Sequence, residues 1–192
     1  MKLTKEKWLK TDIEPFLEYL KSFSKGEEKS VWEKRIVNTK LPCLAVPSTK
    51  INAIVNSIYK GNYISFLNLN IWENHSTTLI FGKLLSKIKD FKILKPYLIN
   101  YSQKADNWST IDCLKFKFTN NNVNDFIQLS KHLIQSPYIF SRRLALIILL
   151  KLLSFENCTD IIFDMLNNLS NENRILCEYG WSMATCRVYD KI

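Results

Sequence analysis

A chain of 192 residues with 46% hydrophobic residues is long enough to bury the core of one domain and too apolar to be disordered. Its four glycines and five prolines are too few for the turns of a many-stranded sandwich or barrel, so the composition favours helices. The net charge of +9 is unevenly spread: residues 1–150 hold 23 Lys and Arg against 12 Asp and Glu, whereas residues 151–192 hold 4 against 6. A basic body of this kind favours a polyanionic partner, either nucleic acid or an acidic membrane surface.

Apolar residues recur at helical spacing along nearly the whole chain. The first helix is expected near residues 13–23, where one face carries Ile13, Phe16, Leu17, Leu20 and Phe23. Further helices are predicted at residues 27–39, 48–60, 63–70, 73–89, 91–101, 107–119, 123–135, 136–153, 159–168 and 171–189. Gly61 is expected to end the third helix as a C′ glycine. Ser136 and Pro137 are expected to supply the N-cap and first residue of the helix that follows them.

Short connectors join these helices into antiparallel pairs, which recur at intervals of roughly 35–40 residues. This spacing is typical of HEAT-type repeats. We therefore predict an all-α protein in which residues 1–192 form a single domain of HEAT-like helical repeats, curved into a right-handed solenoid. A plain helical bundle is the alternative architecture. Nothing in the pattern demands more than a monomer.

The cysteine and histidine pattern favours a reduced, cytoplasmic protein without a metal site. Five cysteines form no CxxC pair, and His75 and His132 are the only histidines. Because no segment supplies metal-ligand spacing, we expect neither a metal nor a cofactor. The N-terminus is charged throughout, unlike a signal peptide, and the longest apolar run, residues 144–150, is far too short for a membrane span.

Most catalytic motifs are absent, including phosphate-binding glycine loops, the GxSxG elbow and HExxH. The first remaining candidate is the pair Trp108 and Asp112, which share a face if they lie on a helix. An indole face and a carboxylate suit a site where positive charge develops. The alternative is structural: Ser109 and Asp112 also have the spacing of a capping box, with Trp108 as the preceding hydrophobic residue.

Two further candidates follow in the chain. Arg142 and Arg143 precede an apolar run, and Arg143 interrupts an otherwise apolar stripe, so its guanidinium needs an anion. That anion is either a phosphate or a carboxylate of the protein itself. Gly180 and Trp181 lie within the last predicted helix, where a glycine costs about 1 kcal/mol relative to alanine. A close approach is therefore expected there, either by a neighbouring helix or by a ligand.

Taken together and in order, these clusters resemble the AlkD-like DNA alkylation repair proteins, which are HEAT-like DNA glycosylases. The likeness extends over about residues 32–189. It rests on Lys34-Arg35-Ile36-Val37-Asn38-Thr39 with Leu44-Ala45-Val46, Ile51 and Ile54, on Trp108 with Asp112, on Phe140-Ser141-Arg142-Arg143, and on Gly180-Trp181.

The resemblance implies a role for each candidate. Trp108 and Trp181 would cradle the deoxyribose of a damaged nucleotide. Asp112 would stabilise positive charge near C1′ and position a water molecule, and Arg143, with Arg142 beside it, would bind backbone phosphate. An alkylated purine already carries positive charge, so its departure needs no general acid and the lack of a suitable histidine is no obstacle.

We therefore expect a DNA repair glycosylase that removes N3- or N7-alkylated purines from double-stranded DNA, without flipping the base. One alternative is a non-catalytic HEAT-like protein that binds damaged, bent or branched DNA through its backbone. Another is a helical scaffold for a second protein, with Trp108 and Trp181 in the core or at an interface.

Overall fold

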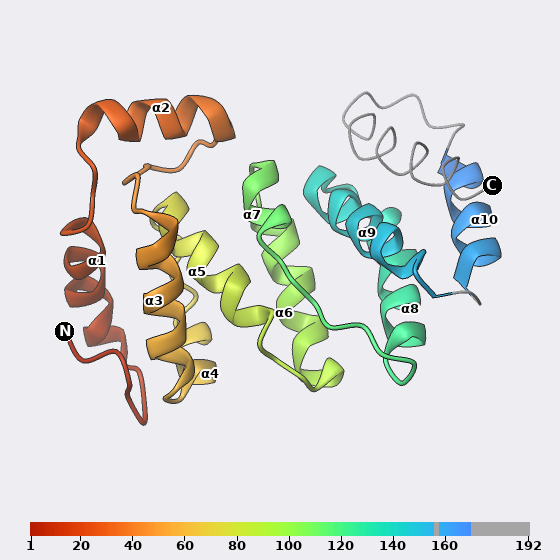
Figure 1. Ribbon diagram of the computed structural model, residues 1–192, viewed down its shortest axis with the longest axis horizontal. Helices are drawn as coiled ribbons and strands as arrows, with labels where there is room; N and C mark the ends of the chain where they lie inside the picture. The colour runs from red at the N-terminus through yellow and green to blue at the C-terminus, as the bar shows by residue number, and fades with distance from the viewer. Residues whose placement is uncertain (156–157, 170–192) are drawn as a thin grey trace. The chain divides into compact units, whose positions relative to one another are not determined.

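The computed structural model describes residues 1–155 and 158–169 (Figure 1). These residues form ten α-helices and one short 3-10 helix, with no strand among them. The prediction of an all-α protein is therefore confirmed. The helix predicted at residues 171–189, with Gly180 and Trp181, lies outside the described residues. Among the described helices, none is long and apolar enough to cross a membrane.

The chain divides into two compact units. The first consists of Met1–Lys89 together with Asp106–Phe116, and the second of Asp90–Ala105 and the chain from Lys117 onward. The chain thus leaves the first unit for one helix, returns for a short one, and then completes the second unit. The single domain and the right-handed HEAT-like solenoid stay predictions.

The first unit is built around a helix with a regular apolar face. Its elements are the 3-10 helix Lys10–Asp12, α1 (Ile13–Lys21), α2 (Glu27–Val37), α3 (Ser48–Tyr59), α4 (Tyr63–Leu67), α5 (His75–Leu85) and α7 (Trp108–Asp112). In α3, the residues predicted to share one face are all buried: Ile51, Ile54, Val55 and Ile58. This face packs against α5 and α4, as the 3.6-residue period requires.

Four aromatic rings form the centre of this core. Trp8 and Phe16 come from the N-terminal segment and α1, Phe66 from α4 and Phe81 from α5. The Phe66 ring lies 4.9 Å from Trp8, 5.1 Å from Phe16 and 5.4 Å from Phe81, measured between centroids. The contacts with Trp8 and Phe16 are edge-on, the arrangement that aromatic quadrupoles favour. These contacts hold the N-terminal segment against α4 and α5.

The predicted helix at residues 107–119 is wrong in its length, because α7 ends at Asp112. Residues 114–119 are not helical. Their side chains alternate: Leu114 is buried and Phe116 partly buried, whereas Lys115 and Lys117 are exposed. A period of two suits an extended segment with one face on the core, and here it overrides helical propensity.

The second unit contains α6 (Phe91–Lys104), α8 (Val123–Ile134), α9 (Ile139–Leu152) and α10 (Thr159–Leu169). Helix α9 packs against α8 and α6. It begins two residues later than predicted, with Tyr138 rather than Ser136 as the N-cap. The Ser136 hydroxyl instead accepts a hydrogen bond from the Tyr138 N–H at 3.2 Å, closing a local turn before the helix.

Gly61 is needed after α3 for a reason other than the predicted cap. The positive-φ positions of the described chain do not include Gly61, so it is not a left-handed C′ glycine. Instead, a Cβ atom at Gly61 would lie 2.5 Å from the carbonyl oxygen of Lys5 and 2.7 Å from its nitrogen. The neighbouring Asn62 N–H donates to that Lys5 carbonyl at 2.7 Å. The missing side chain lets the N-terminal segment pass against the end of α3.

Replacing Gly61 with alanine is expected to destabilise the protein by about 1–3 kcal/mol, the usual cost of overpacking, because backbone atoms must shift. The free energy of unfolding measured with urea tests this. Lys60→Ala, at the exposed neighbouring position, is the control and should change stability by less than about 0.5 kcal/mol. Equal stability of Gly61→Ala and wild type would contradict the close approach.

Candidate active site

The short helix α7 is set in place by a buried asparagine at its N-cap. The Asn107 side-chain oxygen accepts the Thr110 N–H at 3.0 Å, and its amide nitrogen donates to the Thr110 hydroxyl at 2.9 Å. Asn107 is only 1% exposed. An N-cap of this kind satisfies a backbone donor that the helix leaves unpaired, which matters most in a helix of one turn.

The preceding residue, Asp106, anchors the start of α7 to the segment that follows α2. Helix α2 ends where Asn38 adopts a left-handed conformation (φ 54°), which turns Thr39 and Lys40 toward Asp106. The Thr39 hydroxyl donates to both carboxylate oxygens at 2.8 and 2.9 Å, and the Lys40 N–H donates to one of them at 2.7 Å. Asn107 adds a fourth hydrogen bond, at 2.8 Å.

These hydrogen bonds determine the charge state of Asp106. Burial raises the pKa of this carboxyl, but the donors on Asn107, Lys40 and Thr39 favour the charged form and outweigh it. The net effect holds the pKa below its ordinary value of 3.8. Asp106 is therefore a negatively charged anchor at neutral pH.

The inner side of α7 is fixed by contacts with α5. The Thr110 and Thr78 hydroxyls lie 3.2 Å apart and form a hydrogen bond, and both residues are fully buried. Ile111 is also fully buried. With positions 110 and 111 turned inward, the first and last residues of the helix are left for its outer surface.

Trp108 and Asp112 occupy these outer positions. Trp108 is 44% exposed and Asp112 is exposed as well. They are the first and last residues of α7, four positions apart, which puts them on one face. The alternative interpretation of Ser109 and Asp112 as a capping box is wrong, because Asn107 is the N-cap. Trp108 is likewise too exposed to serve as a buried staple.

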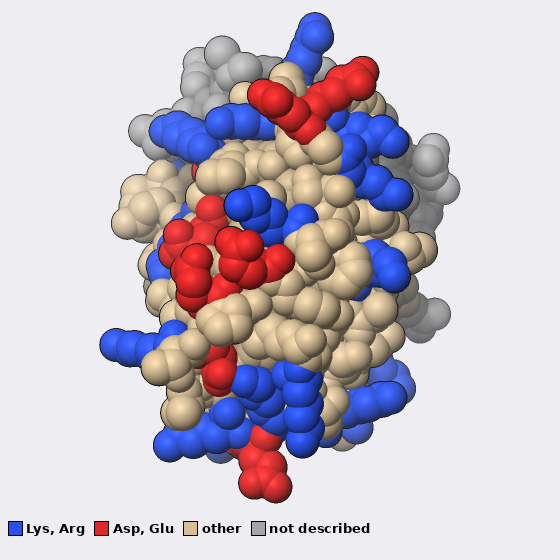
Figure 2. Space-filling model, turned by 90° about the vertical axis from the view of Figure 1, so that its left-hand side faces the viewer, with Lys and Arg blue, Asp and Glu red and all other residues tan. Residues whose placement is uncertain are grey.

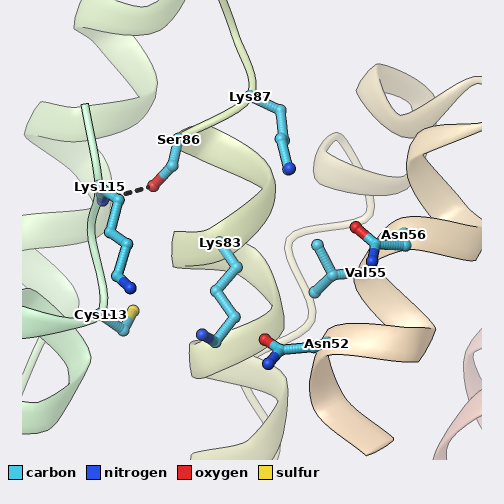
Figure 3. A pocket seen from close by; sticks show the side chains of 8 residues that line it. All are labelled: Asn52, Val55, Asn56, Lys83, Ser86, Lys87, Cys113 and Lys115. Carbon is cyan, nitrogen blue, oxygen red and sulfur yellow. Dashed lines mark hydrogen bonds between the residues drawn. The ribbon is translucent and has the colours of Figure 1, made fainter. Parts of the chain in front are cut away.

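A basic pocket of about 380 Å³ lies in the same unit. Figure 3 shows Lys83 of α5 and Lys87, two residues after the end of that helix, beside the pocket. Lys115 reaches in from the segment after α7, and two asparagines of α3 lie on the opposite side. The Lys115 N–H donates to the Ser86 hydroxyl at 2.9 Å, which fixes that segment beside α5. Three ammonium groups around one hollow favour an anion. Cys113, which directly follows Asp112, also lines the pocket.

The charge elsewhere is mixed. Figure 2 shows the side of the molecule on which α1 lies, where Lys and Arg are interspersed with Asp and Glu. This side therefore carries no continuous basic patch, despite the net charge of +9. The lysines of the pocket mark a specific place for an anion, which the net charge of the chain does not locate.

Arg142 and Arg143, which the sequence predicts to bind phosphate, have different surroundings within the second unit. Arg142 is 5% exposed, and its Nη1 donates to the Ser136 carbonyl at 2.6 Å. Arg143 is only partly buried. Beside them on α9, the buried Ser141 hydroxyl forms a hydrogen bond with Ser102 of α6 at 2.9 Å, which ties the start of α9 to α6. Arg142 is thus partly committed to its own backbone, and Arg143 is less buried than Arg142.

Comparison with known proteins gives one match. The model of the DNA alkylation repair enzyme family matches residues 17–186. The chain belongs to the DNA alkylation repair enzyme family. No curated protein and no solved structure matches it. The family resemblance that the sequence motifs indicated is therefore confirmed.

For this DNA alkylation repair protein, sequence patterns found some of the candidate site and missed the rest. Trp108 and Asp112 were placed on one helical face by their spacing, and the structure agrees. The lysines of the pocket were not singled out, because they are spread over more than thirty positions of a lysine-rich chain. The sequence analysis assigned no role to Asp106. An Asp-Asn pair before a helix signals a cap, but the Thr39 partner is 67 residues away.

Asp106→Asn should weaken the anchor of α7. An amide cannot accept at both oxygen positions, so one donor is left unsatisfied at a cost of about 1–3 kcal/mol at neutral pH. Because the folded-state pKa of Asp106 is lowered, its stabilising effect is present above pH 3.8 and is lost as the pH falls through the folded-state value. The stability difference between wild type and variant should therefore shrink in acid.

Urea unfolding of both proteins at neutral pH and well below pH 3.8 measures this difference. Glu73→Gln, which neutralises an exposed carboxylate of the same unit, is the control. A constant difference between wild type and Asp106→Asn at all pH values would show that the charge of Asp106 is unimportant.

Proposed function

We propose that this DNA alkylation repair protein is a DNA glycosylase that hydrolyses the N-glycosidic bond of N3- or N7-alkylated purines in duplex DNA. The observation that carries the proposal is the exposed pair Trp108 and Asp112 on a helix held rigidly from beneath. Family membership supplies the setting, which is repair of alkylated DNA. The reaction and the lesion are our inference from the chemistry of the pair.

The chemistry requires little more than these two groups. Alkylation at N3 or N7 gives the purine a positive charge, so the C1′–N bond breaks with its electron pair going to the base. The sugar then develops oxocarbenium character, which the carboxylate of Asp112 stabilises and the indole face of Trp108 favours. A water molecule held by Asp112 adds to C1′ and gives up its proton, leaving a free base and an abasic site.

A surface location for this pair suits a base that stays stacked. Trp108 and Asp112 lie on the outer side of α7, where they can approach the sugar from the groove. We therefore propose that the base is not flipped into a pocket, in contrast to many glycosylases. Trp181, which lies outside the described residues, is proposed as the second aromatic contact because of the sequence resemblance.

Binding of the DNA backbone is proposed to use the basic side chains. Lys83, Lys87 and Lys115 surround the pocket next to the end of α7, and a phosphate is the anion that duplex DNA presents. Of the two arginines on α9, we assign the phosphate contact to Arg143, because it is less buried than Arg142. Arg142 is proposed to support it by fixing the start of α9 through the Ser136 carbonyl.

Asp112→Asn should abolish most of the base release while leaving DNA affinity nearly unchanged. The variant keeps the shape of the side chain and loses its charge, which we expect to slow release of N7-methylguanine and N3-methyladenine about 10²–10³-fold. Chromatography of bases released from methylated duplex DNA measures the rate. Asp125→Asn, at an exposed position of α8, is the matched control and should release base at the wild-type rate.

If wild type binds methylated DNA but releases no base, the protein recognises damaged, bent or branched DNA without catalysis. If it neither releases base nor binds DNA above the level of any basic protein, a scaffold function is favoured. If Asp112→Asn releases base at the wild-type rate, the assignment of the catalytic carboxylate is wrong.

Arg143→Ala should weaken DNA binding at every sequence and reduce the salt dependence of the binding constant by about one phosphate contact. Titration of labelled duplex at several salt concentrations gives this slope. Lys131→Ala removes one exposed positive charge from α8 and is the control for a general charge effect. Equal slopes for the two variants would mean that Arg143 makes no specific phosphate contact, and a thermal unfolding curve shows whether Arg143→Ala is folded.

A further inference from the structure

Three potential metal ligands from separate parts of the chain meet in the first unit. Glu33 lies on α2, Cys43 in the connector between α2 and α3, and His75 at the first position of α5. Their ligand atoms all lie within 4.8 Å of one another. His75 Nδ1 is 2.9 Å from Glu33 Oε1. His75 is 2% exposed and the other two residues are partly buried, so the group is shielded from solvent.

The backbone around this cluster holds it in shape. The second oxygen of Glu33 accepts the Ala45 N–H at 2.8 Å, and Ala45 has a φ of 50°, a left-handed conformation that residues other than glycine seldom adopt. The backbone N–H of His75 donates to the Pro42 carbonyl at 2.9 Å. The connector is therefore bound both to α2 and to α5, with Cys43 between the two attachment points.

The local charge is opposite to the charge of the whole protein. Burial raises the pKa of Glu33, but hydrogen bonds from His75 and Ala45 outweigh it, so this carboxyl stays ionised at neutral pH. At Cys43, burial, the charge of Glu33 and the more distant Asp106 raise the pKa to about 12, with only Lys34 acting against them. The thiol thus lies in a negative potential inside a chain of net charge +9.

Within the described part of the chain, the His75 ring is paired through only one of its two nitrogens. Its Nε2 atom is buried and has no hydrogen-bond partner among the described residues. Buried polar atoms are nearly always paired, so an orphaned ring nitrogen requires an explanation. An ion bound at Nδ1, the nitrogen that faces Glu33, would leave Nε2 unpaired, so the clustering of three ligand atoms is the observation that points to a cation.

We propose that Glu33, Cys43 and His75 form a binding site for a zinc ion. Thiolate, imidazole and carboxylate are the three ligand types that zinc takes in proteins, at about 2.3 Å for sulfur and about 2.0–2.2 Å for nitrogen and oxygen. Neighbouring ligands of a tetrahedral zinc are then roughly 3.3–3.7 Å apart. To reach this geometry, the metal would replace the proton between His75 and Glu33 and widen their 2.9 Å separation slightly, while separations of up to 4.8 Å would shorten by about 1 Å.

Binding would release protons. The Cys43 thiol gives its proton to solvent on coordination, because the thiolate is the form that binds a metal. Three protein ligands leave one position for water or another ligand. The bound ion would link α2, the connector and α5, and the same connector carries Thr39 and Lys40, which anchor Asp106. The site would therefore stabilise the support of α7 without taking part in base release.

Cobalt binding tests the site. The full chain, stripped with a chelator and kept reduced, is titrated with Co²⁺, whose bond to a thiolate gives a near-ultraviolet charge-transfer band. We expect a band that saturates with one equivalent and is displaced by Zn²⁺. Cys43→Ser should lose it, whereas Cys113→Ser, which removes another partly buried cysteine of the same unit, should keep it.

Two further variants test the other ligands. Glu33→Gln keeps the size of the side chain and His75→Gln keeps a polar group. Each should weaken cobalt binding by more than about 10-fold, which is the lower end of the cost of losing even an outer-shell partner of a metal site. Glu73→Gln should leave the affinity unchanged.

Thermal unfolding keeps the test valid if a variant is less stable. Zinc should raise the midpoint temperature of unfolding for wild type and for Cys113→Ser, because the ion binds only the folded chain. It should not raise the midpoint temperature of Cys43→Ser. A wild-type protein without the charge-transfer band, or a band that persists in Cys43→Ser, would overturn the proposal. The readout is metal binding rather than base release, so its failure is distinct from failure of the proposed glycosylase.

Discussion

The carboxylate of Asp106 is the interaction on which the candidate site depends. It is charged and partly buried, and it receives hydrogen bonds from Thr39, Lys40 and Asn107. These donors come from two segments of the chain that are more than sixty residues apart. A helix of five residues has too few internal hydrogen bonds to be stable by itself, so its position must be imposed from outside. The cap at Asn107 and the anchor at Asp106 fix the position of α7. They therefore also fix the positions of Trp108 and Asp112 on its outer face.

Two opposite electrostatic environments coexist in the first unit. Lys83, Lys87 and Lys115 surround a pocket suited to an anion, while burial, together with the charges of Glu33 and Asp106, raises the pKa of the Cys43 thiol. The net charge of the chain predicts neither of these two local environments. A phosphate backbone and a divalent cation would each be attracted to a different part of the same small unit. The connector after α2 carries Cys43 of the proposed cation site as well as Thr39 and Lys40, which anchor α7. Repair chemistry at the surface of α7 and metal binding behind it are therefore compatible.

Within each unit, the side chains proposed to contact DNA have a different kind of support. Below α7 the support is polar, through the Thr78 and Thr110 hydroxyls and the Asn107 cap. Buried polar networks are costly unless every member is paired, and when paired they specify one geometry. At the start of α9, the Arg142 guanidinium reaches back to a carbonyl of its own turn. In both places a polar group within the protein holds the side chain that is proposed to meet the DNA.

The sequence by itself determined the all-helical fold and the family, because both depend on local patterns. The apolar face of α3 follows from a period of 3.6 residues, and the spacing of Trp108 and Asp112 places them on one face of a helix. The end of α7 was missed, although the alternation from Leu114 to Lys117 was present, since a short apolar run fits both periods. Only the tertiary structure showed that Gly61 makes room for the backbone of Lys5. It alone also brought Glu33, Cys43 and His75 together. Contacts between distant residues depend on how the elements pack, and no local spacing encodes them.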